Sequence, residues 1–351
     1  MNELAPLTAD PERLLELILD TARELEFHTF VIGVQRPKDY RRDEHEALFR
    51  KIKIDLGLRL EELWPDRVID FERPDVRFEI RPGGNHVRIS PEICPIFIGG
   101  RYLKYSRQIP ATRWRHQVCK GRGCKRCEYT GNVHGPSIQE LATPSVIGAT
   151  GGTDLFFHGA GREDVDARML GTGRPFVFEI RKPRRRFLDL EQLSASINQD
   201  ALGFASVHHL GVASRDSMIL SKDIGAEKSY HAHIEFESEP PADLDELIAS
   251  LAGQDVSQLS PTRVMRRRGE HTLRRKKIVD SRLVHREGRE AVWEVRTSSG
   301  AYVKELVSGD DERTRPSIRE VTGIPCSCVA LDVVAIHWTA PWEADGSPSA
   351  D

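Results

Sequence analysis

The segment from His158 to Phe176 combines the residue types that acid–base and covalent chemistry require. It reads HGAGREDVDARMLGTGRPF, with three acids and three arginines among four glycines. Glycine lets backbone and substrate approach closely, and an arginine beside a carboxylate holds that carboxylate ionised. By composition alone, such a segment is more often a charged loop than an active site. The decision between the two therefore depends on other parts of the chain.

Four side chains that can bind a metal stand upstream of this segment, within twelve residues: His116, Cys119, Cys124 and Cys127. One imidazole and three thiolates match a closed tetrahedral zinc site, and the interleaved glycines allow tight turns around a metal. No open coordination position is evident, which favours a structural zinc ion over a hydrolytic one. Two alternatives stay open: a fourth ligand from Cys94 or elsewhere in place of His116, and a loop that keeps its cysteines as reduced thiols.

Two later segments complete a set of three motifs. Lys228-Ser-Tyr230 opens an alternating strand, and Ser299-Gly-Ala-Tyr-Val-Lys-Glu-Leu306 precedes an acidic loop. With Gly161-Arg162-Glu163-Asp164, they resemble the Gly-Arg-x-Asp, Lys-x-Tyr and Tyr-(Ile/Val)-(Arg/Lys)-x-Leu motifs of pseudouridine synthases, in the same order. The chain is most similar to the archaeal and eukaryotic family that modifies the TΨC arm of tRNA and carries an N-terminal THUMP-type domain. The likeness extends through residues 100–107 and 173–176.

This resemblance implies an isomerisation in which the uridine N-glycosidic bond breaks, the uracil turns, and it is rejoined through C5. Asp164 would be the nucleophile, or the anionic stabiliser, at ribose C1′. Arg162 or Lys304 would keep Asp164 charged, Tyr230 would stack on the extruded base and assist proton removal from C5, and Leu306 would supply an apolar wall. Because the reaction involves no redox change or group transfer, no organic cofactor is expected.

Each of these assignments has a simpler alternative. Asp166 could carry the chemistry, although only Asp164 fits the Gly-Arg-x-Asp spacing. Tyr230 alternates with apolar residues, as any half-buried strand residue does, Lys304 could be a solvent-exposed charge, and Leu306 could be a core residue. One departure from the family also stands out: the Cys-x-x-Cys pair that the family usually has close to the N-terminus is absent.

The leading hypothesis is a tRNA pseudouridine synthase, an isomerase that acts on uridine 55 of the TΨC loop, with uridine 54 as a further target left open. The main alternative is a non-catalytic, zinc-containing tRNA-binding chaperone or processing factor on the same fold. A zinc-dependent nucleic-acid hydrolase is a third option. It predicts strand cleavage that stops on chelation.

The charges are segregated along the chain. The 51 basic and 54 acidic residues give a net charge of −3, which hides seven acids without a base in 234–257 and eight bases against one acid in 261–277. A second basic run, 181–186, holds five further bases. We expect 181–186 and 263–277 to contact RNA phosphates and 234–257 to face away from RNA.

Composition excludes other classes of protein. The six cysteines are too few and too clustered for a secreted disulfide framework. No apolar run approaches the roughly 20 residues of a membrane helix, and the N-terminus has no signal-peptide pattern. We expect a soluble cytoplasmic protein that has no membrane partner, with the oligomeric state open and a monomer favoured.

Hydrophobic periodicity predicts an α+β protein. Helices are expected at 11–25 and 43–63, a strand at 27–34 and a hairpin within 76–89, which together form a small α/β domain. Later strands at 176–180, 204–208, 230–236, 292–296 and 329–337 alternate with helices at 188–198 and 243–251 and with one that opens at Ser317. We therefore predict a THUMP-type RNA-binding domain (1–130) with a zinc knuckle at 116–127, a pseudouridine synthase catalytic domain (131–340) with a mixed, largely antiparallel sheet, and a disordered tail (341–351).

Overall fold

The computed structural model of the chain describes residues 10–36, 42–83, 86–222, 225–263 and 272–344. It divides into two compact units, of which the first comprises 1–97, 143–156 and 179–193 and the second comprises the remainder. The predicted division at residue 130 differs from this one, because the chain leaves the first unit at residue 97 and returns to it twice. Cys119, Cys124 and Cys127 consequently belong to the second unit.

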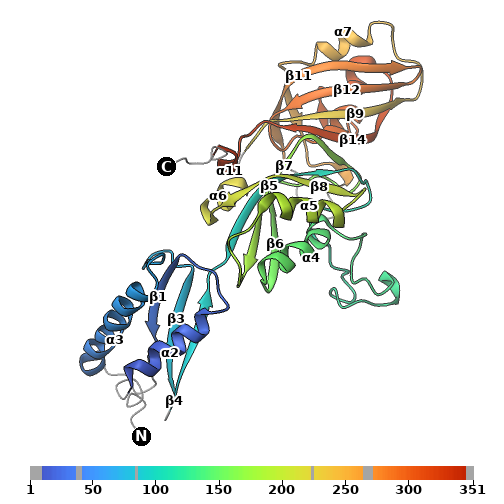
Figure 1. Cartoon of the computed structure of the whole chain (residues 1–351). Helices are drawn as coiled ribbons and strands as arrows, with labels where there is room; N and C mark the ends of the chain where they lie inside the picture. Colours follow the sequence, from blue (N-terminus) through green and yellow to red (C-terminus); the bar gives the residue numbers. More distant parts are fainter. Residues whose placement is uncertain (1–9, 37–41, 84–85, 223–224, 264–271, 345–351) are drawn as a thin grey trace. The chain divides into compact units, whose positions relative to one another are not determined.

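The N-terminal part of the first unit, residues 10–93, is a four-stranded sheet with two helices, drawn from blue to cyan in Figure 1. Its elements are α2 (Pro11–Ala22), β1 (Thr29–Val34), α3 (Arg42–Leu63), β2 (Val68–Ile69), β3 (Val76–Gly83) and β4 (His86–Ile93). The strand order is β2-β1-β3-β4, with β1 parallel to β2 and β3, and with β3 and β4 forming the predicted antiparallel hairpin. At the start of α2, the Asp10 side chain accepts the N–H of Arg13 at 2.9 Å, the cap that the Asp-Pro sequence predicts.

The core of the first unit is aromatic. Phe27 contacts Phe30, Trp64 and Phe78 edge-on, with ring centroids 5.3–6.2 Å apart. Leu14 and Ile18 of α2 are buried in the same cluster. The apolar period that predicted α2 therefore marks the face that the helix packs on the sheet.

The basic run 181–186 is largely used within the first unit. Arg184 pairs with Glu24 at 2.7 Å, and Arg185 donates to the carbonyl of Ala149 at 2.6 Å. Arg186 is nearly buried, pairs with Asp75 at 3.1 Å and also donates to the carbonyl of Cys94. These three guanidinium groups connect parts of the unit, so the expectation of a free phosphate track at 181–186 is not met for them.

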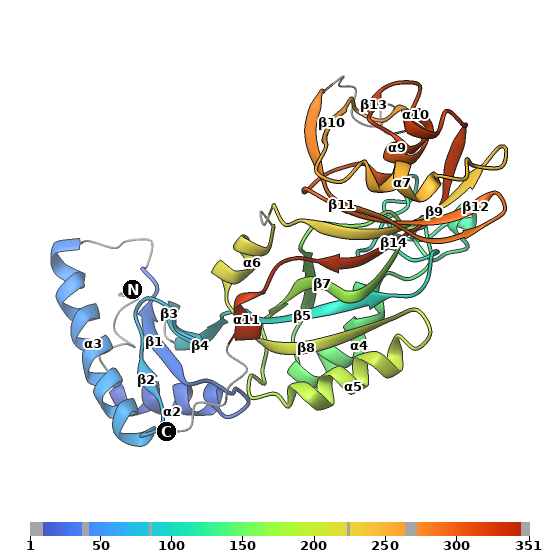
Figure 2. The ribbon, with the colours of Figure 1, turned by 90° about the horizontal axis from the view of Figure 1, so that it is seen from above.

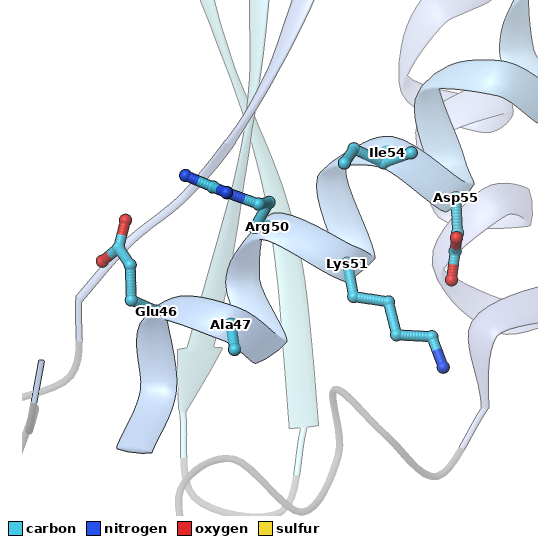
Figure 3. Close-up of a pocket in the computed structure, with 6 residues that line it drawn as sticks. All are labelled: Glu46, Ala47, Arg50, Lys51, Ile54 and Asp55. Carbon is cyan, nitrogen blue, oxygen red and sulfur yellow. The ribbon is translucent and has the colours of Figure 1, made fainter. Parts of the chain in front are cut away.

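A hollow on the outer face of α3 has no cluster of side chains that could form a site. Its lining residues all come from one helix: Glu46, Ala47, Arg50, Lys51, Ile54 and Asp55 (Figure 3). Two of them are acidic and two are basic, a mixture that is typical of a solvated face. We assign no site to it.

The second unit is built on a ten-stranded mixed sheet. Its strands are β5 (Ile96–Lys104), β6 (Asp154–Gly159), β7 (Arg168–Arg181), β8 (Ala205–Ala213), β9 (Lys228–Phe236), β10 (Asp255–Gln258), β11 (Arg274–Glu287), β12 (Glu290–Thr297), β13 (Thr314–Arg315) and β14 (Cys326–Ile336). The order is β13-β10-β11-β12-β9-β14-β7-β5-β8, with β6 paired to β7. The pairs from β13 to β14 are antiparallel and β14–β7 is parallel, so the mixed sheet agrees with the prediction.

The remaining helical segments, shown in part in Figures 1 and 2, are η1 (Lys125–Cys127), α4 (Ile138–Thr150), α5 (Leu190–Asp200), α6 (Arg215–Lys222), α7 (Leu244–Ala249), α9 (Val303–Ser308), α10 (Ile318–Thr322) and α11 (Pro341–Ala344). The part of α4 from Thr143 onward and the part of α5 up to Leu193 belong to the first unit. Figure 2 shows α5 along β8, where Asn198 bonds both the N–H and the carbonyl of Val207. At the start of α10, Ser317 Oγ accepts the N–H of Glu320 at 3.2 Å, as its capping-box spacing predicts.

Two segments were not expected to be regular. Strand β5 reads IFIGGRYLK, which lacks alternation because most of its residues are buried on both sides. The chain from Pro341 to Ala344 was expected to be disordered, yet it forms α11, in which Trp342 is 5% exposed and Glu343 pairs with Arg101. The rest of the predicted tail, 345–351, and residues 264–271 of the second basic track lie outside the described residues. Among the described helices, none is long and apolar enough to cross a membrane.

Candidate active site

The three motif segments meet in one cleft of about 500 Å³ in the second unit. Gly161–Asp164 form one wall, the cleft-facing residues of β9 and β14 form the floor, and the approach to α9 forms another wall. The cleft is lined by Trp114, Gly161, Arg162, Glu163, Asp164, Ala167, Arg174, Lys228, Tyr230, Arg263, Arg274, Ser299, Gly300, Ala301, Tyr302, Val303, Lys304, Leu331 and Val333. The tertiary structure thus unites residues that lie up to 219 positions apart in the sequence.

Asp164 is held by Arg263, the first residue of the basic track 263–277 that was expected to contact RNA phosphates. Its Oδ2 accepts from Arg263 Nη1 at 2.9 Å, and its side chain is 49% exposed. The same guanidinium forms a fork on Glu305, at 2.7 and 3.3 Å, and the Glu305 side chain is only 6% exposed. Burial lowers the pKa of Arg263, but Glu305 and Asp164 outweigh it and raise the pKa above its usual value. Asp164 therefore faces a permanent cation.

The two predicted partners of Asp164 have other contacts. The Arg162 guanidinium lies over the Trp114 ring, 4.7 Å from its centroid. Lys304 Nζ pairs with Asp166 Oδ2 at 2.7 Å. Both side chains line the cleft, but neither ion-pairs with Asp164 in the structure. Arg162 and Lys304 were expected to be the cations beside Asp164, but the cation that pairs with it in the structure is Arg263.

Tyr230 lies on the floor of the cleft. It is 8% exposed and stands opposite Val333 of β14, which also lines the cleft. Burial raises the pKa of its phenol, and Arg174 partly offsets this. Beside it, burial together with repulsion from Arg174 and Lys276 lowers the pKa of Lys228 to about 8.

The apolar surface of the cleft does not come from the predicted residue. Leu306 is 1% exposed and is not among the lining residues, because it faces the core beneath α9. Val303, Leu331 and Val333 line the cleft instead. Leu306 is thus a core residue, as its simpler interpretation proposed.

The Gly161–Asp164 turn rests on a buried ion pair. Glu163 and Arg174 are both 2% exposed and approach to 2.8 Å, and Tyr102 donates to Glu163 at 2.8 Å. Arg174 also donates to the carbonyl of Ala160 at 3.0 Å. Gly161 has a φ of +78°, a conformation that favours glycine, and a Cβ there would lie 3.2 Å from Arg174. Glycine at position 161 therefore leaves room for the Arg174 guanidinium beside the turn.

A fully buried lysine holds the chain that follows Asp164. Lys104 is 0% exposed, and its ammonium donates to the carbonyls of Val165 at 2.8 Å, Ile109 at 3.1 Å and Asp164 at 3.4 Å. Burial lowers its pKa to about 8, although Glu163 and Asp166 oppose the shift. Lys104 is thus a charged clamp on the backbone of the candidate nucleophile.

This lysine predicts a pH dependence of stability. Its pKa of about 8 in the folded state lies below the ordinary lysine pKa of 10.5, so between these pH values the unfolded chain binds more protons than the folded one. We expect the difference in free energy of unfolding, wild type minus Lys104→Met, to rise by roughly 2 kcal/mol as pH increases from 7 to 9.5. Urea unfolding at pH 7, 8 and 9.5 measures it. For the control Lys277→Met, which changes an exposed lysine, the difference in free energy of unfolding from wild type should not change with pH. If the difference for Lys104→Met is equally independent of pH, Lys104 is not a buried cation.

A strained loop fixes the position of Arg263. Asp310, Asp311 and Glu312 all have left-handed backbones, with φ of 44°, 53° and 65°. Such conformations cost roughly 1–2 kcal/mol per residue. In this loop, Asp310 Oδ2 accepts the N–H of Thr262 at 2.9 Å, directly before Arg263. The strained loop thus holds the backbone directly before Arg263, the residue that faces Asp164.

The four candidate metal ligands also come together. Their ligand atoms lie within 4.8 Å of one another. Cys127 Sγ is 3.9 Å from Cys119 Sγ and 3.8 Å from Cys124 Sγ, and His116 Nδ1 is 3.4 and 3.6 Å from Cys119 and Cys124. A tetrahedral zinc ion with Zn–S bonds of about 2.3 Å and a Zn–N bond of about 2.0 Å places two sulfurs about 3.8 Å apart and sulfur and nitrogen about 3.5 Å apart. The donor set therefore fits a metal ion, with His116 and not Cys94 as the fourth member.

Comparison with known proteins decides the family. The family model described as Pus10, C-terminal, matches residues 97–337. A curated tRNA pseudouridine synthase Pus10 of Methanothermobacter marburgensis is 38% identical over 89% of this chain and 79% of its own length. The chain belongs to the Pus10 family. Another Pus10 relative, from Archaeoglobus fulgidus, is 36% identical over 93% of this chain and 91% of its own length.

The Pus10 family model starts where the second compact unit starts, at residues 97 and 98 respectively. The cleft and the metal-ligand cluster both fall inside the matched region. Among solved structures, a Cbf5-Nop10-Gar1 complex aligns over 57% of this chain and 46% of that chain, with 15% identity and a TM-score of 0.37. That similarity is too low to support any argument.

Proposed function

We propose that this Pus10 family member isomerises uridine 55 of the TΨC loop of tRNA to pseudouridine, with uridine 54 as a second target to be tested. The observation that carries the proposal is the meeting of Asp164, Tyr230 and Lys304 in one cleft with a fixed cation beside Asp164. The curated relatives are tRNA pseudouridine synthases, which are isomerases and which supply the substrate class.

In this reaction the bond between N1 and ribose C1′ breaks and a bond between C5 and C1′ forms. Asp164 attacks C1′, or stabilises the positive charge that develops there. Arg263 places a positive charge 2.9 Å from Asp164 Oδ2 and holds this carboxylate at the cleft. The uracil turns over Tyr230 and is rejoined, C5 loses its proton and N1 gains one, so the product is an isomer of the substrate. No electron or group leaves, and no organic cofactor takes part.

The test uses an unmodified tRNA transcript and the purified full chain. We expect pseudouridine at position 55 after incubation, mapped by carbodiimide block to reverse transcription, with position 54 scored in the same lane. A transcript with cytidine at position 55 is the control and is expected to show no stop there. If no pseudouridine forms on the transcript, the non-catalytic tRNA-binding alternative replaces the proposal.

We propose that His116, Cys119, Cys124 and Cys127 bind a structural zinc ion. Three cysteines and a histidine leave no position for a substrate water, so the ion would organise the loop and take no part in the chemistry. The N–H groups of Cys124 and Gly131 point to Cys127 Sγ at 3.2 and 3.3 Å, a contact that favours a thiolate ligand.

Metal analysis of the purified protein tests the zinc proposal. We expect about one zinc ion per chain, lost in Cys127→Ser and kept in Cys328→Ser, which changes a cysteine outside the cluster. Because structural zinc stabilises the fold it organises, removal by a chelator should lower the thermal unfolding midpoint without any cleavage of tRNA. Zinc-free wild-type protein would refute the site, and zinc-dependent cleavage of tRNA would support a hydrolase instead.

We propose that the first compact unit binds tRNA at a distance from the reacting base, as a THUMP-type domain would. Its α/β sheet fits such a role, and the family resemblance suggests it. With the full chain, we expect intact tRNA to bind more tightly than a short stem-loop that contains only the TΨC arm, while kcat on the two RNAs stays similar; equal affinity for both RNAs would contradict this role.

A further inference from the structure

A second hollow of about 360 Å³ adjoins the cleft in the second unit. It shares Trp114, Gly161, Arg162 and Glu163 with the cleft. Its own walls are formed by Pro110, Ala111, Thr112, Phe157, His158, Gly159 and Val165. The proposed reaction at Asp164 uses none of these residues.

Trp114 and Arg162 form the partition between the two hollows. The guanidinium lies over the indole ring at 4.7 Å. The Trp114 backbone is fixed, because its carbonyl accepts the N–H of Val133 at 2.9 Å and its ring contacts His134 at a centroid distance of 5.0 Å. A fixed aromatic ring paired with an arginine plane is the surface on which unpaired RNA bases stack.

The other walls favour a flat, partly apolar ligand. Pro110 and Ala111 are pinned to the start of α4, because their carbonyls accept the N–H groups of Ile138 and Gln139, each at 3.1 Å. Phe157 and Val165 add apolar surface. Glu163 supplies a carboxylate whose side chain is 2% exposed and whose Oε2 accepts from Arg174 Nε at 2.8 Å. An acceptor of this kind suits the N–H edge of a nucleobase and repels a phosphate.

We propose that this second hollow binds the base of a nucleotide adjacent to the target uridine, stacked against Trp114 and Arg162. This inference rests on the proposed function. Because the two hollows share one partition, the target base and its neighbour occupy opposite sides of it. In the bound RNA, the two bases no longer stack on each other. Each of them stacks instead on one side of the Trp114–Arg162 pair.

The experiment pairs a change in the protein with a change in the RNA. Ala111→Leu narrows the second hollow and leaves every residue of the cleft unchanged. The matching RNA carries an abasic ribose at the 5′ or the 3′ neighbour of the target. We expect kcat/KM for pseudouridine formation to fall about 5- to 100-fold with Ala111→Leu on normal RNA and with wild-type protein on one of the two abasic RNAs, the range for loss of one stacked base. Combining the two changes should add little, because both remove the same contact.

Trp114→Phe and Trp114→Ala provide the matched pair for the partition. Phenylalanine keeps a ring for stacking and should retain most of the activity, whereas alanine should lower kcat/KM about as far as the abasic RNA does. The wild-type protein on abasic RNAs keeps the test valid even if a variant fails to fold. Normal turnover on both abasic RNAs, or losses that multiply in the combination, would overturn the subsite. No turnover by wild-type protein on normal RNA would instead overturn the proposed function.

Discussion

Replacement of Asp164 by asparagine is expected to lower kcat for pseudouridine formation by about 10⁴-fold or more. Asparagine has nearly the same shape and still bonds Arg263, but it can neither attack C1′ nor balance the positive charge that develops there. Single-turnover assays on unmodified tRNA transcript measure the loss. Because the Asp164 side chain is 49% exposed and its ion pair is at the surface, the cost to folding should stay within about 1 kcal/mol.

Asp166→Asn is the matched control for this substitution. Asp166 lies two residues further along the same loop and pairs with Lys304 at 2.7 Å, with 65% of its side chain exposed. We expect its kcat to remain within about tenfold of wild type. Turnover that survives Asp164→Asn, or that disappears in Asp166→Asn, would move the nucleophile to the other carboxylate.

The second large effect is expected at Arg263. Arg263→Gln removes the cation that faces Asp164, and we expect kcat to fall about 10²- to 10³-fold, the range for loss of a preorganised electrostatic partner. The same change leaves Glu305, which is 6% exposed, without its partner. An unpaired buried carboxylate is strongly destabilising, roughly by 3–5 kcal/mol, so stability must be measured beside activity.

The double variant Arg263→Gln, Glu305→Gln separates the two roles. It removes the orphaned buried charge, so thermal stability should recover most of the loss, whereas kcat should stay low because Asp164 still lacks its cation. Recovery of kcat together with stability would mean that Arg263 acts only through the fold. A normal kcat in the single variant would remove Arg263 from the site altogether.

Local signals in the sequence were sufficient for the elements and for several site residues. Apolar spacing predicted α2, α3 and the β3–β4 hairpin, because each buries one face and the period records which face it is. The capping sequences at Asp10 and Ser317 were confirmed because a cap is formed by residues three positions apart. The spacing of His116, Cys119, Cys124 and Cys127 indicated a cluster for the same reason, since a short loop can bring its own ligands together.

Predictions from the sequence were wrong where one residue type fits several structural environments. In the sequence, an arginine in a basic run gives the same signal whether it contacts RNA or forms ion pairs and hydrogen bonds within the fold. Arg184, Arg185 and Arg186 turned out to connect parts of the first unit. Strand β5 was missed because burial on both sides removes the alternation that identifies a strand.

The sequence by itself determined the candidates for the reactive groups, Asp164, Tyr230 and Lys304 in their motifs, and a set of candidate metal ligands within twelve residues. Only the tertiary structure decided what surrounds them. Arg263 reaches Asp164 across 99 positions, Trp114 meets Arg162 across 48, and Leu306 turns away from the cleft into the core. The physical reason is that motif spacing describes one loop at a time, whereas the charge, stacking and burial at a site depend on which loops the sheet brings together.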